Sequence, residues 1–330
     1  MFRSCTAALF LGAALAVAGT ANAADITFKL AHGASDKHPF HKLAEYYKEA
    51  VEKKTGGKVS VELFPNRQLG DDIDVLKAAR AGTVDAAIAS SVLFPWIVKA
   101  QALDALQLPF LLTTYDNMSK MLQSESAQKM LASLDGIGLQ GISIGEGGLR
   151  HFLSTKGPVR TLEDFKGQKT RIVPAALHKA MWEAVGANPT PVKYGEVYTA
   201  LKTNLIDAVE INISSVETEN LWESAKHLTT TGHYFWPGVL VHNKAKFDRL
   251  PEDVQTAMME AGREIIGPQV AYTRDEEAET AERLKAKGVN IYPFDALPEM
   301  RKAMAPILAK WMESDPLIPE FVAAAEKLEK

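Results

Sequence analysis

Cysteine is almost absent from this chain of 330 residues, since Cys5 is the only one. One cysteine excludes an internal disulfide framework, a paired-thiol redox site and a Cys-rich zinc site. Long runs of one charge are also missing, and the 37 basic and 41 acidic residues leave a net charge of −4. A mildly acidic chain without a basic stripe is a poor candidate for binding nucleic acid, which depends on neutralising phosphates.

Common catalytic signatures are missing as well. The sequence has no Gly-Xaa-Ser-Xaa-Gly elbow, no phosphate-binding Walker loop and no His-Glu-Xaa-Xaa-His helix. His32, His38 and His41 are close in sequence, but no carboxylate or thiolate completes an evident ligand set, so no metal site is predicted. No cofactor is expected either. A second hypothesis, a periplasmic enzyme using Glu146 or Glu210 as acid or base, has only these two carboxylates in its favour.

The N-terminus carries a segment typical of protein export. Arg3 precedes an apolar run from Ala7 to Ala18, and Ala21-Asn22-Ala23 follows as an A-x-A cleavage site. The run is shorter than the ~20 residues that a membrane anchor needs, so 1–23 is predicted to be a signal peptide. Cys5 lies before the run, so it is not a lipoprotein cysteine. The expected location of the mature protein is the periplasm.

Strand and helix patterns alternate along the rest of the chain. Strands are expected at 25–31, 59–63 and 84–89, with helices at 39–55 and 71–81 between them. A second series follows, with strands at 139–144, 151–155, 169–173 and 205–209 and helices at 175–185 and 196–202. This alternation predicts two α/β units with crossover helices. Tyr234 to His242 has a strand pattern but no local partner, so the chain is expected to cross back to the first unit there.

The C-terminal third is expected to be helical. A long helix should begin after Pro251 and run to about 287, with a kink at Gly267-Pro268. At ~1.5 Å per residue it would span roughly 50 Å, enough to brace both units. Two amphipathic helices, 297–313 and 316–329, follow.

These patterns give a domain plan. Lobe I is expected to comprise 24–148 and about 237–270, and lobe II 149–236 and about 271–300. The C-terminal helices occupy about 301–330. A cleft between the lobes is the expected ligand site, because the carboxyl ends of strands and the N-termini of helices face it. The glycine-rich segment Gly145-Glu146-Gly147-Gly148 is expected to form a tight connection between the lobes.

Two arginines are candidates for binding an anion in this cleft. Arg171 lies near the C-terminal end of an apolar strand, and Arg150 follows the glycine-rich segment. A guanidinium offers a planar fork that matches a carboxylate with two parallel hydrogen bonds. His32, which ends the first strand, is a further candidate donor to a ligand.

At the level of motifs, the chain resembles the DctP-type solute-binding proteins of tripartite ATP-independent periplasmic (TRAP) transporters. The similar stretches cover most of the chain. They are Leu30-Ala31-His32 with His38-Pro39, 61–65 with 68–70, Leu108-Pro109-Phe110, Arg171 through Pro191, 196–203, Ile206-Asp207 with Glu210, 231–233 and Asn243-Lys244.

This resemblance implies a fold, a function and site residues. The fold would be of the periplasmic-binding-protein type, with two α/β lobes around a cleft and a long kinked helix bracing both. Arg171 would form a two-pronged salt bridge with a ligand carboxylate, Arg150 would match a second family arginine, and Tyr194 would pack on the ligand. The protein would not be an enzyme. It would capture an organic acid anion and deliver it to a sodium-coupled permease of two membrane subunits, one small and one large.

In one place the chain departs from the family pattern. The family often has Gln-Glu-Asn-Pro after the aspartate that matches Asp207, and its asparagine helps to bind the carboxylate. Here the run is Val209-Glu210-Ile211-Asn212, which puts Ile211 at the asparagine position. Either Asn212 replaces that asparagine, or an apolar contact replaces one hydrogen bond.

Aromatic residues are the candidate walls of the binding site. They are Phe94, Pro95 and Trp96, Trp182, and Tyr234, Phe235 and Trp236, although buried aromatic residues more often belong to a core. If several line the cleft, the ligand is an aromatic acid or a sugar acid, bulkier than a four-carbon dicarboxylate. Two other binding roles stay open at this point: a sensor subunit for a membrane receptor, and the binding protein of an ATP-driven importer.

Overall fold

The computed structural model describes residues 24–329, so the predicted signal peptide lies outside the described residues. Within that range the strands form one connected ten-stranded sheet with the order β2-β1-β3-β9-β4-β7-β5-β6, while β8 pairs with β4 and β10 with β8. The strands are β1 (Ile26–His32), β2 (Val59–Phe64), β3 (Ala86–Ser90), β4 (Leu139–Ser154), β5 (Lys169–Ile172), β6 (Asn188–Pro191), β7 (Ala208–Asn212), β8 (His227–Thr230), β9 (Phe235–Asn243) and β10 (Asn290–Pro293).

Helices cover the sheet. They are α1 (Pro39–Lys54), α2 (Asp72–Ala81), α3 (Leu93–Val98), α4 (Tyr115–Leu122), α5 (Glu125–Ala132), α6 (Ala176–Ala184), α7 (Val197–Lys202), α8 (Ile213–Thr218), α9 (Lys244–Phe247), α10 (Glu252–Glu264), α11 (Ile266–Ala286), α12 (Leu297–Met312) and α13 (Leu317–Leu328). Short 3₁₀ helices are η1 (Gln101–Gln107), η2 (Ser133–Ile137), η3 (Glu163–Phe165), η4 (Tyr194–Glu196) and η5 (Leu221–Glu223).

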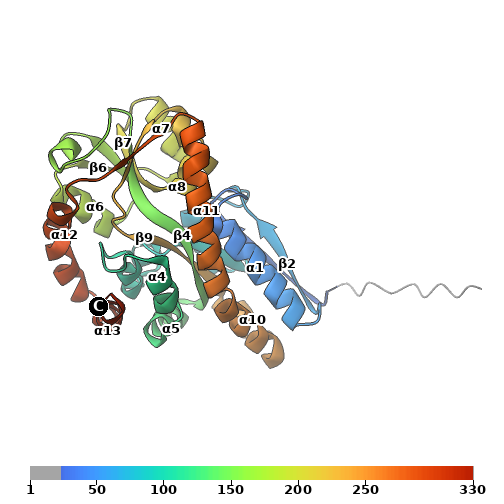
Figure 1. Ribbon diagram of the computed structural model, residues 1–330. Helices are drawn as coiled ribbons and strands as arrows, with labels where there is room; N and C mark the ends of the chain where they lie inside the picture. Colours follow the sequence, from blue (N-terminus) through green and yellow to red (C-terminus); the bar gives the residue numbers. More distant parts are fainter. Residues whose placement is uncertain (1–23, 330) are drawn as a thin grey trace, which may run out of the picture.

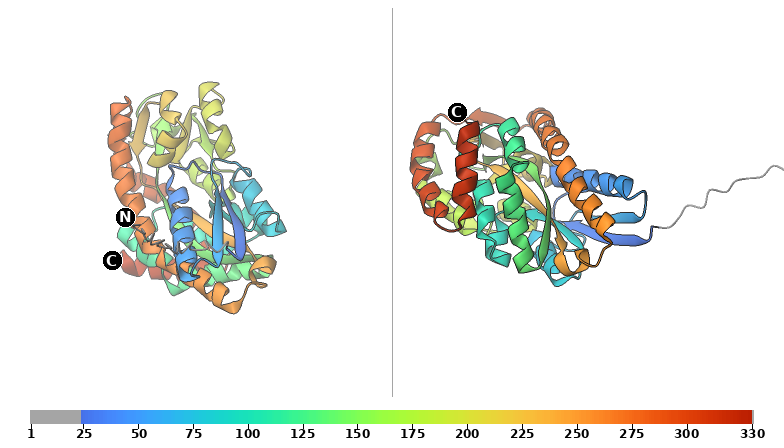
Figure 2. Two further views of the ribbon diagram at one scale, coloured as in Figure 1. Left: turned by 90° about the vertical axis from the view of Figure 1, so that its right-hand side faces the viewer. Right: turned by 90° about the horizontal axis from the view of Figure 1, so that it is seen from below.

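The long strand β4 divides the molecule into two lobes. Its residues from Leu139 to Leu149 pair with β9, beside β3, β1 and β2, and this half of the sheet forms the first lobe. From Arg150 onward β4 pairs with β7 and β8 in the second lobe. In Figure 1, β4 and α11 run side by side through both lobes. In the left view of Figure 2, the green and yellow second lobe lies above the blue first lobe.

The predicted return of the chain to the first lobe is confirmed. Strand β9 pairs antiparallel with β3, from Ser90 opposite Gly238 to Ala86 opposite His242. On its other side it pairs antiparallel with β4. All nine residues of β9 are buried, as expected for a strand in the middle of a sheet covered on both faces.

The predicted connection between the lobes at 145–148 lies within one continuous strand. This glycine-rich segment belongs to β4, before the point where β4 leaves β9 of the first lobe and pairs with β7 and β8 of the second. The pairing with β9 shifts between Glu146 and Leu149, and Gly148 has φ +116°. At Gly147 a Cβ would lie 2.9 Å from both the Phe40 ring and the Trp236 carbonyl oxygen. The glycines therefore let neighbouring groups pack closely against an irregular part of the strand, where a side chain would clash.

The kink in the long C-terminal helix is confirmed. Helix α10 ends at Glu264, and α11 begins at Ile266. Proline has no N–H to donate to the carbonyl four residues earlier, and its ring clashes with that carbonyl. Residue 264 is the carbonyl four residues before Pro268, so the break lies where the proline requires it. Helix α11 then contacts α1 and α4 of the first lobe and α8 of the second.

Candidate ligand-binding cleft

A small cavity lies where the two lobes meet. It has a volume of about 20 Å³, enough for about one water molecule. Residues from the ends of strands and the beginnings of helices surround it, which is the expected position for a ligand site in α/β sheets. The first lobe contributes Asp71, Asp72, Ile73, Ser90 and Leu93, the second contributes Arg171, Val173, Pro174, Lys193 and Tyr194, and Trp236 comes from β9.

Arg171 is buried in the wall of this cavity and is 1% exposed. Its Nε donates to the carbonyl oxygen of Val192 at 3.0 Å, while its Nη1 has no hydrogen-bond partner among the described residues. Burial lowers the pKa of Arg171 to about 10, with Glu210 opposing and Arg150 adding to the effect. The guanidinium is thus still charged at neutral pH. A buried cation without an anionic partner is costly, so an anion in the cavity would be stabilised.

Arg150 is fully buried and holds Glu210. Its Nε donates to Glu210 Oε2 at 2.8 Å, and its Nη2 donates to the Glu210 carbonyl oxygen at 2.5 Å. The guanidinium also lies 4.6 Å from the ring centre of Trp236, a cavity wall, and its Nη1 has no partner among the described residues. Arg150 does not itself line the cavity.

The carboxylate of Glu210 stays charged in this arrangement. Burial alone would raise its pKa, but Arg150, His233 and His178 outweigh burial and hold the pKa well below its usual range. The hydroxyl of Tyr234 adds a hydrogen bond to Glu210 Oε2 at 2.6 Å. Glu210 therefore neutralises one of the two buried arginines, and Arg171 is left without such a partner.

Asn212 and Ile211 lie on opposite faces of β7. Asn212 faces Arg150 in the neighbouring strand, and its Nδ2 donates to the Gly147 carbonyl oxygen at 2.6 Å. Its Oδ1 has no partner among the described residues. Ile211 belongs to an apolar cluster. Successive residues of a strand alternate in direction, so Asn212, and not Ile211, is on the polar face with Glu210.

Two of the candidate aromatic residues line the cavity. The Tyr194 hydroxyl donates to Ser215 Oγ at 2.8 Å, and the Trp236 ring nitrogen donates to Ser90 Oγ at 2.6 Å. Both polar ends are therefore occupied, and the rings present apolar surface to the cavity.

Four further candidate residues lie away from it. His32 Nε2 lies 3.1 Å from His41 Nδ1, and burial, with His41 adding to it, lowers the pKa of His32 to about 3. Phe94 is fully buried in the core of the first lobe, and its neighbour Leu93 lines the cavity instead. Trp96 is 50% exposed on a separate groove of about 610 Å³, which shares only Pro174 with the cavity. Trp182 packs against Phe152 and Phe165.

Asp71 and Asp72 are cavity residues that the sequence reasoning missed. Asp71 caps α2 in a capping box with Asp74, and Asp72 accepts from the backbone N–H groups of Gly33 and Ser90, both at 3.2 Å. Burial raises the pKa of Asp72 to about 7, and Asp71 adds to the effect. The sequence did contain a signal for them. Two adjacent carboxylates begin a predicted helix just after a strand and loop, which is where side chains face a ligand site.

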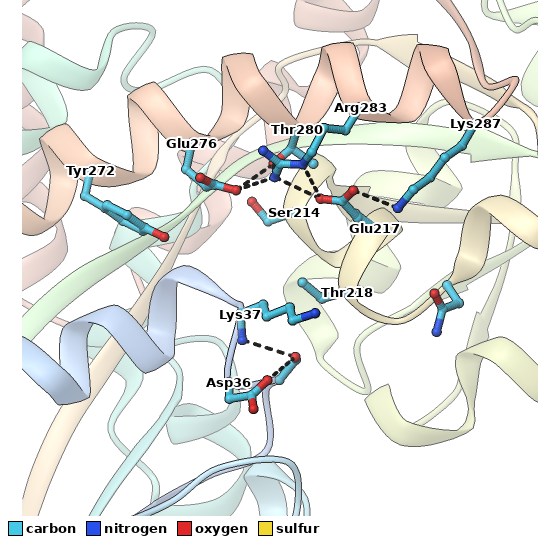
Figure 3. A pocket seen from close by; sticks show the side chains of 12 residues that line it. Asp36, Lys37, Ser214, Glu217, Thr218, Tyr272, Glu276, Thr280, Arg283 and Lys287 are labelled. Carbon is cyan, nitrogen blue, oxygen red and sulfur yellow. Dashed lines mark hydrogen bonds and ion pairs between the residues drawn. The ribbon is translucent and has the colours of Figure 1, made fainter.

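A larger groove lies elsewhere. It has about 670 Å³ and lies between α11, α8 and the loop before α1 (Figure 3). Two of its cations are already paired: Arg283 contacts Glu217 and Glu276, and Lys287 contacts Glu217 at 2.8 Å. Among the described residues, no cluster of three or more His, Cys, Asp or Glu could hold a metal ion, and no helix could span a membrane.

Residues 30–315 match the model of the bacterial extracellular solute-binding proteins, family 7, also called DctP. The chain belongs to this family. A curated member, the 2,3-diketo-L-gulonate-binding periplasmic protein of Escherichia coli, is 31% identical over 88% of this chain and 87% of its own. The C4-dicarboxylate-binding periplasmic protein of Rhodobacter capsulatus is 29% identical over 89% and 87%.

Solved structures of TRAP periplasmic solute-binding proteins share the fold. A TRAP periplasmic solute-binding protein from a Bradyrhizobium species, in complex with D-galacturonate, has a TM-score of 0.85 and 31% identity over 91% of this chain and 99% of its own. One from Chromohalobacter salexigens, with bound D-glucuronate, has a TM-score of 0.84 and 28% identity over 91% and 99%. The resemblance and the two-lobed α/β fold are thus confirmed, and the family consists of transport binding proteins rather than enzymes.

Proposed function

We propose that this family 7 protein captures a sugar acid in the periplasm, holds its carboxylate with Arg171, and delivers it to a sodium-coupled TRAP permease of two membrane subunits. The observation that carries the proposal is the buried Arg171 guanidinium, charged and incompletely paired in the wall of the cavity between the lobes. The predicted signal peptide, 1–23, would direct the chain to the periplasm.

The cavity residues suit a hydroxylated acid better than a dicarboxylate. Arg171 and Lys193 supply positive charge in the second lobe, whereas Asp71, Asp72 and Ser90 supply acceptors in the first. Sugar hydroxyl groups donate hydrogen bonds to carboxylates, but a second ligand carboxylate would face two acidic side chains. The solved relatives with bound galacturonate and glucuronate support the same class of ligand.

Arg150 and Asn212 have supporting roles in this proposal. Arg150 is paired with Glu210 and lies against the ring of Trp236, so it supports a wall of the cavity from behind. Asn212, whose Oδ1 has no hydrogen-bond partner among the described residues, would accept a hydrogen bond from the ligand. The aromatic faces of Tyr194 and Trp236 would contact the apolar side of the sugar ring.

Calorimetric titration of the exported protein tests this function. Galacturonate, glucuronate, succinate and benzoate are titrated into the wild type and the Arg171→Ala variant. We expect a sugar acid to bind the wild type and Arg171→Ala to lose about 30-fold to several thousand-fold in affinity, because a buried carboxylate would be left unpaired. Arg160→Ala, which removes an exposed pair with Asp295, is the control. Unchanged affinity in Arg171→Ala would refute the proposed contact.

A further inference from the structure

A sugar acid cannot enter the cavity in the conformation described here. The cavity holds about 20 Å³, whereas sites for small molecules usually enclose ~300 Å³ or more. The lobes must therefore separate before a ligand of this size reaches Arg171. Every contact between the lobes at the rim is broken in that step, and such contacts set how readily the cleft opens.

Arg67 makes the clearest of these contacts. It lies in the loop between β2 and α2 of the first lobe, where its Nη1 donates to the Gly33 carbonyl oxygen at 3.1 Å. Its two Nη atoms contact the two carboxylate oxygens of Glu219, the residue after α8 in the second lobe. The side chains are only 26% and 13% exposed, so water screens this forked pair less than an ordinary surface pair.

The same side chain touches a wall of the cavity. The Arg67 guanidinium lies 5.2 Å from the ring centre of Tyr194. At Gly195, a Cβ would lie 2.8 Å from Arg67 Nε, so the arginine packs directly on this glycine. Asp71 Oδ2 also accepts from the Gly195 N–H at 3.1 Å. The segment 194–195 of the second lobe is thus held by two side chains of the first.

The backbone that carries Arg67 adopts an unusual conformation. Asn66 and Arg67 have φ +56° and +60°, two consecutive non-glycine residues in the left-handed region. Such residues are strained and persist when their surroundings fix them. Here the Asn66 N–H donates to the Ala34 carbonyl oxygen at 2.8 Å, and the Gly70 N–H donates to the Arg67 carbonyl oxygen at 3.0 Å. The loop therefore holds Arg67 in a defined direction, toward the second lobe.

We infer that Arg67 is a positioning residue which latches the two lobes together over the cavity and sets the rate of ligand exchange. The latch consists of Arg67, Glu219, Tyr194 and Gly195. The identity of the exchanged ligand rests on the proposed function, whereas the closure of the lobes does not. Because the latch joins the lobes both with and without ligand, it slows entry as well as release.

Opening is measured first without any ligand. In the exported protein, which would have lost Cys5 with residues 1–23, spin labels at Lys77→Cys in α2 and Thr203→Cys after α7, both exposed, report the distance between the lobes. We expect one dominant distance in the wild type and a second, longer distance in Arg67→Ala and in Glu219→Gln. The double variant should show no more opening than either single variant, since both remove one contact. Arg160→Ala, with its forked pair to Asp295, is the control.

Exchange is then measured by stopped-flow tryptophan fluorescence with galacturonate. We expect Arg67→Ala to raise the association and dissociation rate constants by about five-fold each, the size of a modest ion pair, while Kd changes less than two-fold. Arg67→Lys, which keeps the charge but loses the fork, should fall between. A distance distribution identical to that of the wild type, or a rise in the dissociation rate alone, would overturn the latch. Failure of every acid to bind the wild type would refute the proposed function and leave the distance result valid.

Discussion

Gln269 of α11 satisfies both backbone groups of Glu146 in β4. Its Oε1 accepts from the Glu146 N–H at 2.7 Å, and its Nε2 donates to the Glu146 carbonyl oxygen at 2.8 Å. Glu146 lies where the pairing of β4 with β9 becomes irregular, so its backbone lacks the regular partners of a strand. The side chain of a helix thus replaces strand pairing just before β4 enters the second lobe.

Replacing Gln269 should destabilise the whole protein. In Gln269→Leu, the buried N–H of Glu146 loses its acceptor, which costs about 1–3 kcal/mol, while the Thr273 hydroxyl still donates to the Glu146 carbonyl oxygen at 3.0 Å. We expect a loss of about 1–3 kcal/mol in the free energy of unfolding, measured with urea. Gln123→Ala, which removes an exposed glutamine bonded to Ser119 within α4, is the control. A loss no larger than that of the control would show that other groups or water take over.

The side chain of Glu146 predicts a dependence of stability on pH. Burial raises its pKa to about 8, although the N–H groups of Gly148, Trp236 and Gly147 oppose the shift. Between about pH 4.5 and 8 the unfolded chain releases this proton and the folded protein keeps it. This group therefore lowers the free energy of unfolding as pH rises, by up to about 1.4 kcal/mol per pH unit.

The isosteric variant Glu146→Gln isolates that contribution. The amide has no proton to release, so the stability of the variant relative to the wild type should increase from pH 5 to pH 8. Guanidinium unfolding at each pH measures both proteins. If the free energies of unfolding of the two proteins change with pH in the same way, the pKa of Glu146 is not raised in the folded protein. Burial lowers the pKa of His178 to about 3, so below pH 6.5 this histidine makes the free energy of unfolding rise with pH. Both proteins contain His178, so its contribution cancels when the variant is compared with the wild type.

Arg171→Lys tests whether the carboxylate contact needs a fork. An ammonium keeps the charge but lacks the two parallel donors, and it is more strongly hydrated. We expect sugar acid affinity to fall by at least ten-fold, less than in Arg171→Ala, by calorimetric titration. Wild-type affinity in Arg171→Lys would show that charge alone suffices.

Variants of Trp236 and Trp96 test which of two neighbouring hollows binds the ligand. Trp236 lines the cavity and donates to Ser90, whereas Trp96 is half exposed on the neighbouring groove. We expect Trp236→Phe to weaken sugar acid binding several-fold and Trp96→Ala to change it less than two-fold. A large loss in Trp96→Ala would extend the ligand site into that groove.

Several elements could be predicted because their signals are local. Pro39 begins α1, Gly82 ends α2 in the left-handed conformation, and Pro268 sets the break between α10 and α11. These residues act through backbone sterics and the loss of one N–H, which depend little on distant parts of the chain.

Other elements depended on tertiary contacts. The segment 205–209 was expected to be a strand, but β7 begins at Ala208 and ends at Asn212, and Leu205 is 57% exposed. The partner strands β4 and β5 set that register. Likewise, 139–144 and 151–155 merge into β4, because β9, β7 and β8 supply pairing partners along its length.

The family, the two α/β lobes and the candidate arginines follow from the chain alone, because periodicity, prolines and ordered motifs are local properties of the sequence. Which charges are neutralised depends on how the chain folds. Arg150 and Arg171 are equivalent as sequence, yet Glu210 pairs with Arg150 and leaves Arg171 in the cavity wall. Folding also brings Asp72 and Arg67 to the cleft. Contacts between the lobes join residues that are far apart in the chain, and no local sequence pattern shows that such residues will be close in space.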